Sequence, residues 1–249
     1  MSSKATPVLH IKGLERKFGS KTVHRGVDLE LFENELLALF GGSGAGKSLI
    51  LRSIIGLETP DSGEIHWEGR RITGLTENEW IEVRKKIAYV FQNGALFDSL
   101  TVFENLAYPL REHTRLTEAQ IRSRVAEMLA IVDMPGSENL LPAELSGGMQ
   151  KRAGLARAMI LGPEILLFDE PTAGLDPSNT TRFVQNILGL KNRGLTGIFV
   201  THDISSALAV ADRIAILHEG RIYCTDTAQR IQESRDPIVR NFLFPEEKT

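Results

Sequence analysis

Short apolar runs alternate with amphipathic stretches along the chain. The most apolar runs, residues 36–40, 87–91, 165–168 and 197–200, contain no charged side chain. A strand that is apolar at successive positions is covered on both faces, as in a parallel sheet flanked by helices. The pattern therefore predicts an α/β fold built on a largely parallel sheet.

Helix starts are marked between these runs. Thr76 with Glu79, and Thr117 with Gln120, have the spacing of capping boxes, in which two side chains satisfy free backbone N–H groups. After Thr117, apolar residues recur on one helical face, which predicts an amphipathic helix. These residues are Ile121, Val125, Met128, Leu129 and Val132.

The middle of the chain differs from its two ends. Residues 94–154 lack a convincing buried strand, which predicts a helical subdomain inserted into a sheet-based core. Asp176–Pro177 has the composition of a helix start, and Gly194 lies near the expected end of that helix. From Asp226 onward we expect one helix and a charged tail.

Composition limits the possible partners and compartments. The 249 residues include 29 basic and 32 acidic side chains, a balance that argues against nucleic acid as the main partner. The single cysteine, Cys224, excludes an intrachain disulfide and a cysteine-rich zinc cluster. Residues 1–7 lack the apolar stretch of a secretory signal, and no apolar run is long enough to span a bilayer.

A glycine-rich phosphate loop follows the first apolar run. The segment matches G-x-x-x-x-G-K-[ST] and precedes a helical stretch, so its backbone N–H groups can surround phosphate oxygens at a helix N-terminus. Lys47 can reach the β- and γ-phosphates of ATP, and Ser48 can bind Mg²⁺. A structural glycine-rich turn is the alternative. The predicted ATP-binding residues are Gly41, Gly42, Ser43, Gly44, Ala45, Gly46, Lys47, Ser48 and Leu49.

Two carboxylates end the run at 165–168. Asp169 and Glu170 follow a buried strand directly, at the edge where ligands bind in open parallel sheets. We predict that Asp169 binds Mg²⁺ through water and that Glu170 is the general base for an attacking water. An exposed turn is the alternative, but the phosphate loop favours the catalytic interpretation.

Further motifs give the chain a family resemblance. Leu145–Gln150 reads Leu-Ser-Gly-Gly-Met-Gln, residues 171–176 read Pro-Thr-Ala-Gly-Leu-Asp, and Gln92 and His202 each follow an apolar run. Together with the phosphate loop and the carboxylate pair, their order resembles that of the ATP-binding cassette (ABC) ATPases over nearly the whole chain.

The resemblance implies roles at the matching positions. Phe18 matches the aromatic residue that stacks on adenine, and Gln92 matches a residue near Mg²⁺ and the attacking water. His202 matches the residue that contacts the γ-phosphate, and Asp176 matches a residue of the D-loop at the dimer interface. A core aromatic, a polar strand end, a structural histidine and a helix N-cap are the respective alternatives.

The resemblance also implies that one copy is insufficient. In this family two subunits pack head to tail, and the signature segment of one faces the ATP held by the other. Ser146, Gly147 and Gly148 would then meet the γ-phosphate bound to Lys47 of a second copy. The backbone N–H groups and the helix N-terminus of this segment provide the anion site.

The fold expected for such a chain has three parts. A P-loop NTPase (RecA-like) α/β core with a parallel or mixed sheet carries an N-terminal antiparallel β subdomain and the inserted helical subdomain. Residues 1–225 would form this ATP-binding domain, and residues 226–249 the C-terminal helix and tail.

Segments that flank the motifs resemble a narrower group. Gly94–Phe97, Val102–Asn105, Tyr108–Thr114, Met149 and Asp236–Leu243 are similar to the ATPases of Mla-type systems, which move phospholipid between the membranes of Gram-negative bacteria. This resemblance implies a peripheral location at the cytoplasmic face of the inner membrane and a membrane permease as partner. A lipid-binding substrate protein and a small regulatory subunit are further implied partners.

Other functions remain open from the sequence. An ABC importer ATPase for another solute and a non-transport ABC ATPase share the same motifs, and residues 94–114 could dock a permease whatever its cargo. An ordinary P-loop kinase or GTPase leaves residues 145–150 and His202 unexplained. The intact set of Lys47, Asp169, Glu170 and His202 argues against a pure binding module.

Overall fold

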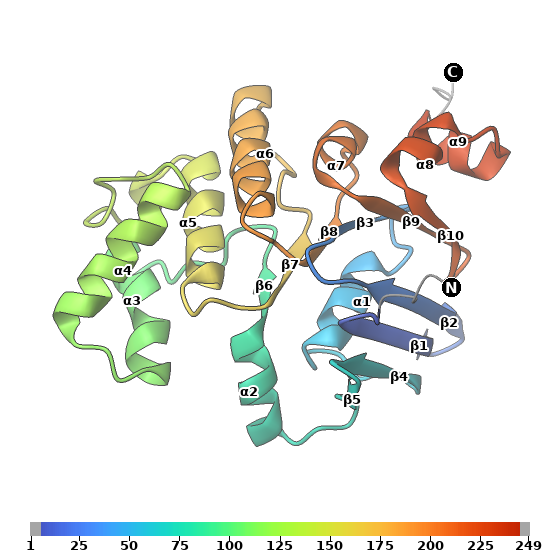
Figure 1. Cartoon of the computed structure of the whole chain (residues 1–249), viewed down its shortest axis with the longest axis horizontal. Helices are drawn as coiled ribbons and strands as arrows, with labels where there is room; N and C mark the ends of the chain where they lie inside the picture. Colours follow the sequence, from blue (N-terminus) through green and yellow to red (C-terminus); the bar gives the residue numbers. More distant parts are fainter. Residues whose placement is uncertain (1–5, 245–249) are drawn as a thin grey trace.

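Two sheets with helices between and around them form the framework of the computed structural model, which describes residues 6–244 (Figure 1). Residues 1–5, part of the segment in which no secretory signal is expected, lie outside the described residues. The end of the predicted charged tail, residues 245–249, also lies outside them. The larger sheet has the order β10-β9-β3-β8-β7-β6 and is parallel except for β9–β10. Its strands are β3 (Leu36–Gly41), β6 (Ile87–Val90), β7 (Ile165–Asp169), β8 (Gly197–Val200), β9 (Arg213–His218) and β10 (Arg221–Thr227).

The smaller sheet is antiparallel and has the order β2-β1-β4-β5. It consists of β1 (Leu9–Phe18), β2 (Lys21–Leu31), β4 (Ser62–Trp67) and β5 (Arg70–Arg71). Helix α1 (Lys47–Ile54) lies between the two sheets (Figure 1), and its buried residues Ile50, Leu51 and Ile54 join both in one apolar core. The expected mixed-sheet core and N-terminal antiparallel sheet are therefore confirmed.

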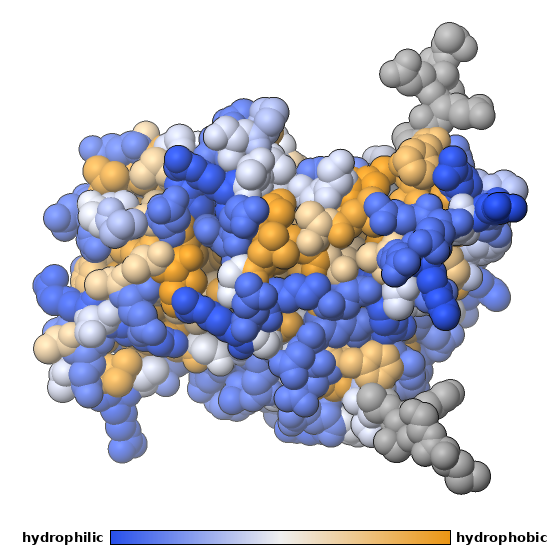
Figure 2. Space-filling view, turned by 45° about the horizontal axis from the view of Figure 1, so that its top comes forward, coloured by the Kyte–Doolittle hydropathy of each residue, from blue (hydrophilic) through white to orange (hydrophobic). Residues whose placement is uncertain are grey.

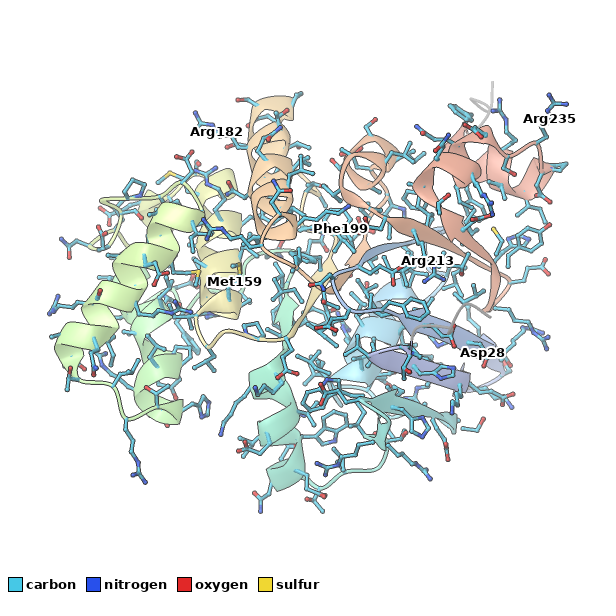
Figure 3. All side chains as sticks on the ribbon, in the orientation of Figure 1. Asp28, Met159, Arg182, Phe199, Arg213 and Arg235 are labelled. Carbon is cyan, nitrogen blue, oxygen red and sulfur yellow. The ribbon has the colours of Figure 1, made fainter. Side chains whose placement is uncertain are left out.

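The four apolar runs all form strands of the larger sheet, as predicted. Alternate residues of each strand enter different cores: Leu37 and Leu39 face α1, whereas Leu36, Ala38 and Phe40 face the helices on the other side. Phe199 (Figure 3) lies in this second core with its ring centroid 5.7 Å from that of Phe168. Burial on both faces explains why these strands contain no alternating polar positions.

Residues 94–154 contain helices and loops, without a strand. Helix α2 (Glu77–Lys86) leads into β6, and beyond it lie α3 (Val102–His113), α4 (Glu118–Ile131), the 3₁₀ turn η1 (Pro142–Glu144) and α5 (Gly147–Met159). The three long helices form the lobe at the left of Figure 1. Both capping boxes are confirmed, since Glu79 accepts the Thr76 N–H at 2.9 Å and Gln120 accepts the Thr117 N–H at 2.8 Å.

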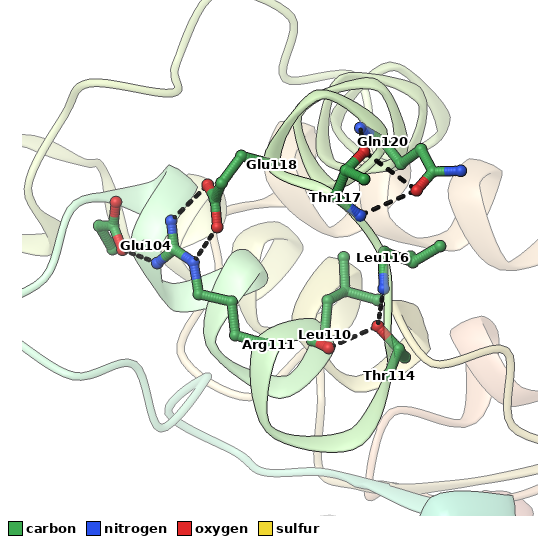
Figure 4. A network of polar contacts seen from close by, with 8 residues as sticks. All are labelled: Glu104, Leu110, Arg111, Thr114, Leu116, Thr117, Glu118 and Gln120. Atoms are coloured by element: carbon green, nitrogen blue, oxygen red, sulfur yellow. Dashed lines mark hydrogen bonds and ion pairs between the residues drawn. The ribbon is translucent and has the colours of Figure 1, made fainter.

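A surface network joins two helices of this lobe (Figure 4). The Arg111 guanidinium at the end of α3 donates to both oxygens of Glu118 at the start of α4, at 2.8 and 2.9 Å, and also to Glu104. These groups are exposed, and solvent and salt screen exposed ion pairs so that they contribute little to stability. The apolar residues between the helices therefore provide most of the stability, among them Leu106, Leu110, Ile121, Val125 and Leu129.

The C-terminal part departs from the expectation of a single helix. β10 extends to Thr227, and two short helices follow, α8 (Ala228–Glu233) and α9 (Pro237–Leu243). Pro237 has no N–H to donate, so a new helix begins there, and Asp236 caps it by accepting from Ile238 N–H at 2.8 Å. The remaining helices, α6 (Pro177–Lys191) and α7 (Ile204–Val210), lie on the face of the large sheet opposite α1.

Candidate functional site

The phosphate loop connects β3 to α1 and can be formed only with glycine at its last turn. Gly44 and Gly46 have φ angles of 71° and 96°, in the left-handed region that favours glycine. A Cβ at Gly46 would lie 2.5 Å from His24 Nε2, so a larger residue has no room. Gly46 is the N-cap of α1, and the free N–H groups of the first helical turn therefore border the loop.

Lys47 is folded back over the loop. Its Nζ donates to the carbonyl oxygens of Gly41 at 2.9 Å and Gly42 at 3.3 Å, and lies 3.4 Å from His202 Nε2. Burial lowers the pKa of Lys47, and the nearby carboxylates of Glu170 and Asp169 oppose that shift. A buried ammonium that donates to the loop's own carbonyls is available to an anion that enters the loop.

Asp169 has a hydrogen bond on each carboxylate oxygen. Ser48 Oγ donates to Oδ1 at 2.6 Å, and the hydroxyl of Tyr89 donates to Oδ2 at 2.7 Å. A hydroxyl and a carboxylate oxygen side by side at the loop are hard oxygen donors of the kind that Mg²⁺ prefers. The donor set therefore fits the predicted metal. Burial, followed by the Asp169 carboxylate, raises the pKa of Tyr89, so its hydroxyl stays a donor.

Glu170 and His202 form a second polar pair at the same edge. The Glu170 carboxylate accepts the His202 backbone N–H at 3.1 Å and lies 3.1 Å from His202 Nε2. Glu170 has a φ of 49°, a left-handed conformation that is uncommon for a residue other than glycine. This backbone conformation is consistent with a functional constraint on where the carboxylate points.

Lys47, Ser48, Glu170 and His202 share one cavity of about 360 Å³. It is lined by Phe18, Val23, Gly44, Gly46, Lys47, Ser48, Leu49, Arg52, Glu170 and His202. Phe18 is 50% exposed, with the Arg16 guanidinium 4.6 Å from its ring centroid. An exposed aromatic ring beside a phosphate loop can stack on a base, and a core role for Phe18 is contradicted by its exposure.

Other residues of the predicted loop stand outside that lining. Gly41 and Gly42 contribute the carbonyls that hold Lys47, and Ala45 lines a neighbouring cavity. Gln92 is exposed and follows β6, whose residue Val90 pairs with Phe168 of β7. It therefore lies at the sheet edge that carries Glu170 but does not line the cavity.

The signature segment lies at the start of α5 and away from this cavity. Ser146 is the exposed N-cap and accepts the Met149 N–H at 3.3 Å, and neither it nor Gly147 or Gly148 lines the cavity. Gly148 packs against α6, where a Cβ would lie 2.3 Å from Asn179 Oδ1. Within one chain the signature and the phosphate loop are thus not brought together.

Asp176 caps α6, as its sequence position predicted. It accepts the Asn179 N–H at 2.9 Å, and this backbone bond is the main cause that lowers the pKa of the carboxyl. The preceding loop is held from α5, because the buried Lys151 ammonium donates to the Ala173 carbonyl. The signature helix α5 therefore contacts α6 through Gly148 and Asn179, and the loop before Asp176 through Lys151 and Ala173.

Sequence reasoning missed three polar residues of the site, and the apolar Val23 of the cavity lining. Tyr89 sits within an apolar run and His24 within a strand, and Arg52 lies one helical turn beyond the phosphate loop. A polar hydroxyl inside an otherwise apolar buried strand was the one available signal, because such a group needs a hydrogen-bond partner. No local pattern marks His24 or Arg52, because the Gly46 partner of His24 and the cavity lined by Arg52 are formed only when the chain folds.

His24 packs against the phosphate loop and should make the stability of the protein depend on pH. It is fully buried, its Nε2 lies 3.1 Å from the Gly46 carbonyl, and burial lowers its pKa. Below its ordinary pKa of about 6.5 the unfolded chain gains a proton on His24 that the folded chain resists. We expect the free energy of unfolding to decrease as the pH is lowered below that value. The decrease should be less steep in His24→Gln.

Denaturant unfolding at about pH 7.5 and about pH 5.5 measures this difference. The exposed His113→Gln is the matched control, since it removes a histidine outside the core. Equal pH slopes for the wild type and His24→Gln would contradict the interpretation.

Comparisons with known proteins extend these observations. A family model described as ABC transporter matches residues 24–173, a span that includes the phosphate loop, the signature and both carboxylates. Over 236 residues the chain is 40% identical to a Mycobacterium leprae protein described as a probable ribonucleotide transport ATP-binding protein, mkl. That match covers 94% of this chain and 68% of the relative.

Two further proteins are similar over most of their length. MlaF of Escherichia coli K12, the ATP-binding protein of an intermembrane phospholipid transport system, is 40% identical over 226 residues, with 90% of this chain and 84% of the relative covered. The solved dimeric structure of the ATP-binding cassette MJ0796 bound to ADP and Pi superimposes with a TM-score of 0.81 at 31% identity. It covers 88% of this chain and 98% of the cassette.

Proposed function

Because the chain belongs to the ABC transporter family of ATPases, we propose that its ATP hydrolysis drives phospholipid transport between two membranes through an integral membrane permease. The observation that carries the ATPase part is the convergence of Lys47, Glu170 and His202 on one cavity beside Ser48 and Asp169. The similarity to MlaF over most of its length supports the phospholipid part.

The cavity residues divide the chemistry of hydrolysis among them. The phosphate loop and Lys47 bind the β- and γ-phosphates, and the ring of Phe18 stacks on the adenine. Ser48 and Asp169 would hold Mg²⁺, which neutralises phosphate charge when bound. Glu170 accepts a proton from the attacking water as the water oxygen bonds to the γ-phosphorus, the bond to the β,γ-bridging oxygen breaks and ADP leaves. His202 orients Glu170 and contacts the γ-phosphate.

A second copy of the chain is needed to complete this site. Ser146 is exposed and stands apart from its own cavity, and the backbone N–H groups that follow it are an anion site without a phosphate in the same chain. Head-to-tail pairing brings this segment to the γ-phosphate held by the other copy. In that dimer Asp176 lies at the interface, and Gln92 approaches Mg²⁺ and the water.

The proposed surface for the permease follows Gln92 closely in the chain. Phe97 and Tyr108 are 50% and 48% exposed and meet edge to face, with ring centroids 5.8 Å apart. The loop under Phe97 is rigid, because the buried Asn105 side chain bonds the Phe97 N–H and carbonyl at 2.8 and 3.1 Å and Arg157 donates to the Ala95 carbonyl at 2.6 Å. An exposed aromatic pair formed by a held loop and helix α3 is typical of a docking surface.

The membrane connection comes through that surface. Among the helices within residues 6–244, none has the length and apolar character to cross a bilayer. We propose that the chain associates peripherally with the cytoplasmic face of an inner membrane through the permease. A lipid-binding substrate protein and a small regulatory subunit complete the proposed complex.

Transfer of labelled phospholipid between donor and acceptor vesicles tests this function. The complex purified with its permease should move phospholipid only with ATP, and Phe97→Glu should lose both the permease and transfer because a charge enters the aromatic contact. Phe244→Glu is the matched control, since Phe244 is 55% exposed and follows α9 in the C-terminal part of the chain. ATP-dependent transfer without any permease, or equal loss in both variants, contradicts the proposal.

Ribonucleotide is the competing cargo, because the mycobacterial relative carries that description. Uptake of labelled ribonucleotide into vesicles that contain the complex, with no lipid transfer, would favour it.

A further inference from the structure

Tyr89 contacts the site from the neighbouring strand and has no part in the chemistry described above. It lies on β6, paired with Leu167 of β7, two residues before Asp169. Its hydroxyl donates to Asp169 Oδ2 at 2.7 Å, while Ser48 donates to Oδ1. The Tyr89 side chain is only 8% exposed, so this hydrogen bond is shielded from water.

The location of this tyrosine is unusual for a buried strand. The other residues of β6 are aliphatic, and a phenol in such a strand is stable only when its hydroxyl finds a partner. The partner of the Tyr89 hydroxyl is the Asp169 carboxylate, whose other oxygen accepts a hydrogen bond from Ser48 of the phosphate loop. With Oδ2 held by Tyr89, the carboxylate keeps Oδ1 directed toward Ser48.

We propose that Tyr89 is a positioning residue that orients the Asp169 carboxylate for Mg²⁺ and so sets the Mg²⁺ requirement of nucleotide binding. The inference rests on the proposed role of Asp169 as a magnesium residue. Groups that hydrogen-bond to a metal-binding carboxylate typically change metal affinity about 10–100-fold when removed. Tyr89 adds this orientation without contacting the nucleotide.

The test measures Mg²⁺-dependent binding of ADP, which is not hydrolysed. A fluorescent ADP is titrated into the full-length chain in EDTA and then with increasing Mg²⁺. Tyr89→Phe removes one oxygen and keeps the ring, so the fold is retained. We expect unchanged ADP affinity in EDTA and a Mg²⁺ midpoint raised about 10-fold, because the carboxylate loses its orientation.

Tyr223→Phe is the matched control. Its hydroxyl also donates to an aspartate, Asp236 Oδ2 at 2.9 Å, but the pair is exposed and belongs to β10 and the C-terminal helices. This variant should keep the wild-type Mg²⁺ midpoint. A Tyr89→Phe midpoint within about twofold of wild type would overturn the inference, since removal of an orienting partner changes affinity more than that.

Asp169→Asn separates this outcome from failure of the site assignment. If Asp169→Asn raises the Mg²⁺ midpoint and Tyr89→Phe does not, the role of Tyr89 is wrong and the magnesium site stands. If neither substitution changes the midpoint, the assignment of Asp169 itself is wrong. If Tyr89→Phe weakens ADP binding equally in EDTA and in Mg²⁺, the phenol supports the loop rather than the carboxylate, and the inference is also overturned.

Discussion

Glu170→Gln should reduce ATP turnover by about two to four orders of magnitude while ATP binding is retained. Glutamine keeps the shape and the carbonyl oxygen that accepts the His202 N–H, but it cannot take a proton from water. The phosphate loop and Lys47 are unchanged, so ATP still binds. Because the γ-phosphate is then not released, the variant should accumulate as a closed dimer in ATP.

Phosphate release measures turnover, and gel filtration with ATP measures the dimer. Glu164→Gln is the matched control, because Glu164 precedes the other end of β7 and its side chain forms an exposed ion pair with Lys86 at 2.8 Å. It should hydrolyse ATP at the wild-type rate. Near-normal turnover in Glu170→Gln would remove Glu170 from the role of base, and a monomer in ATP would count against the closed dimer.

The parts of the fold that were predictable share a local cause. The strands at 36–40 and 165–168 are recognised because burial on both faces requires apolar residues at every position. The capping boxes and the Asp176 cap were predictable because a cap depends on residues within one turn. β9 and β10 were not identified, and the second C-terminal helix was missed although Pro237 marks its start.

The residues of the candidate site also fall into those that a local motif predicts and those that only the fold brings to the site. Lys47, Ser48 and Glu170 stand in motifs whose spacing implies their chemistry, and the fold places them together. Tyr89 and His24 reach the site across strand pairings that no local pattern reveals. Residues 6–244 of one copy hold only part of the predicted triphosphate site, because Ser146 caps α5 and does not line the cavity of the phosphate loop.

That division between copies leads to a mixing prediction. Lys47→Ala removes the ammonium that binds the phosphates and should weaken ATP binding about 10–100-fold, since charge-assisted hydrogen bonds are among the strongest. Ser146→Arg should leave binding to the isolated chain intact but block turnover, because the bulky side chain obstructs the neighbouring site. Each variant alone should therefore be nearly inactive.

An equal mixture of the two should regain activity. Half of randomly formed dimers are mixed, and in each mixed dimer one of the two sites pairs an intact Lys47 with an intact Ser146, so about a quarter of the sites recover. Mixing Lys47→Ala with Glu170→Gln provides the control. Both of those residues serve the same chain's cavity, so each mixed dimer has one defect in each site and no recovery is expected. Turnover measures recovery, and ATP-dependent pairing of differently tagged copies measures formation of the mixed dimer. Equal recovery in both mixtures would show that Ser146 does not serve the partner's phosphate loop. The same conclusion would follow if neither mixture recovered by either measurement.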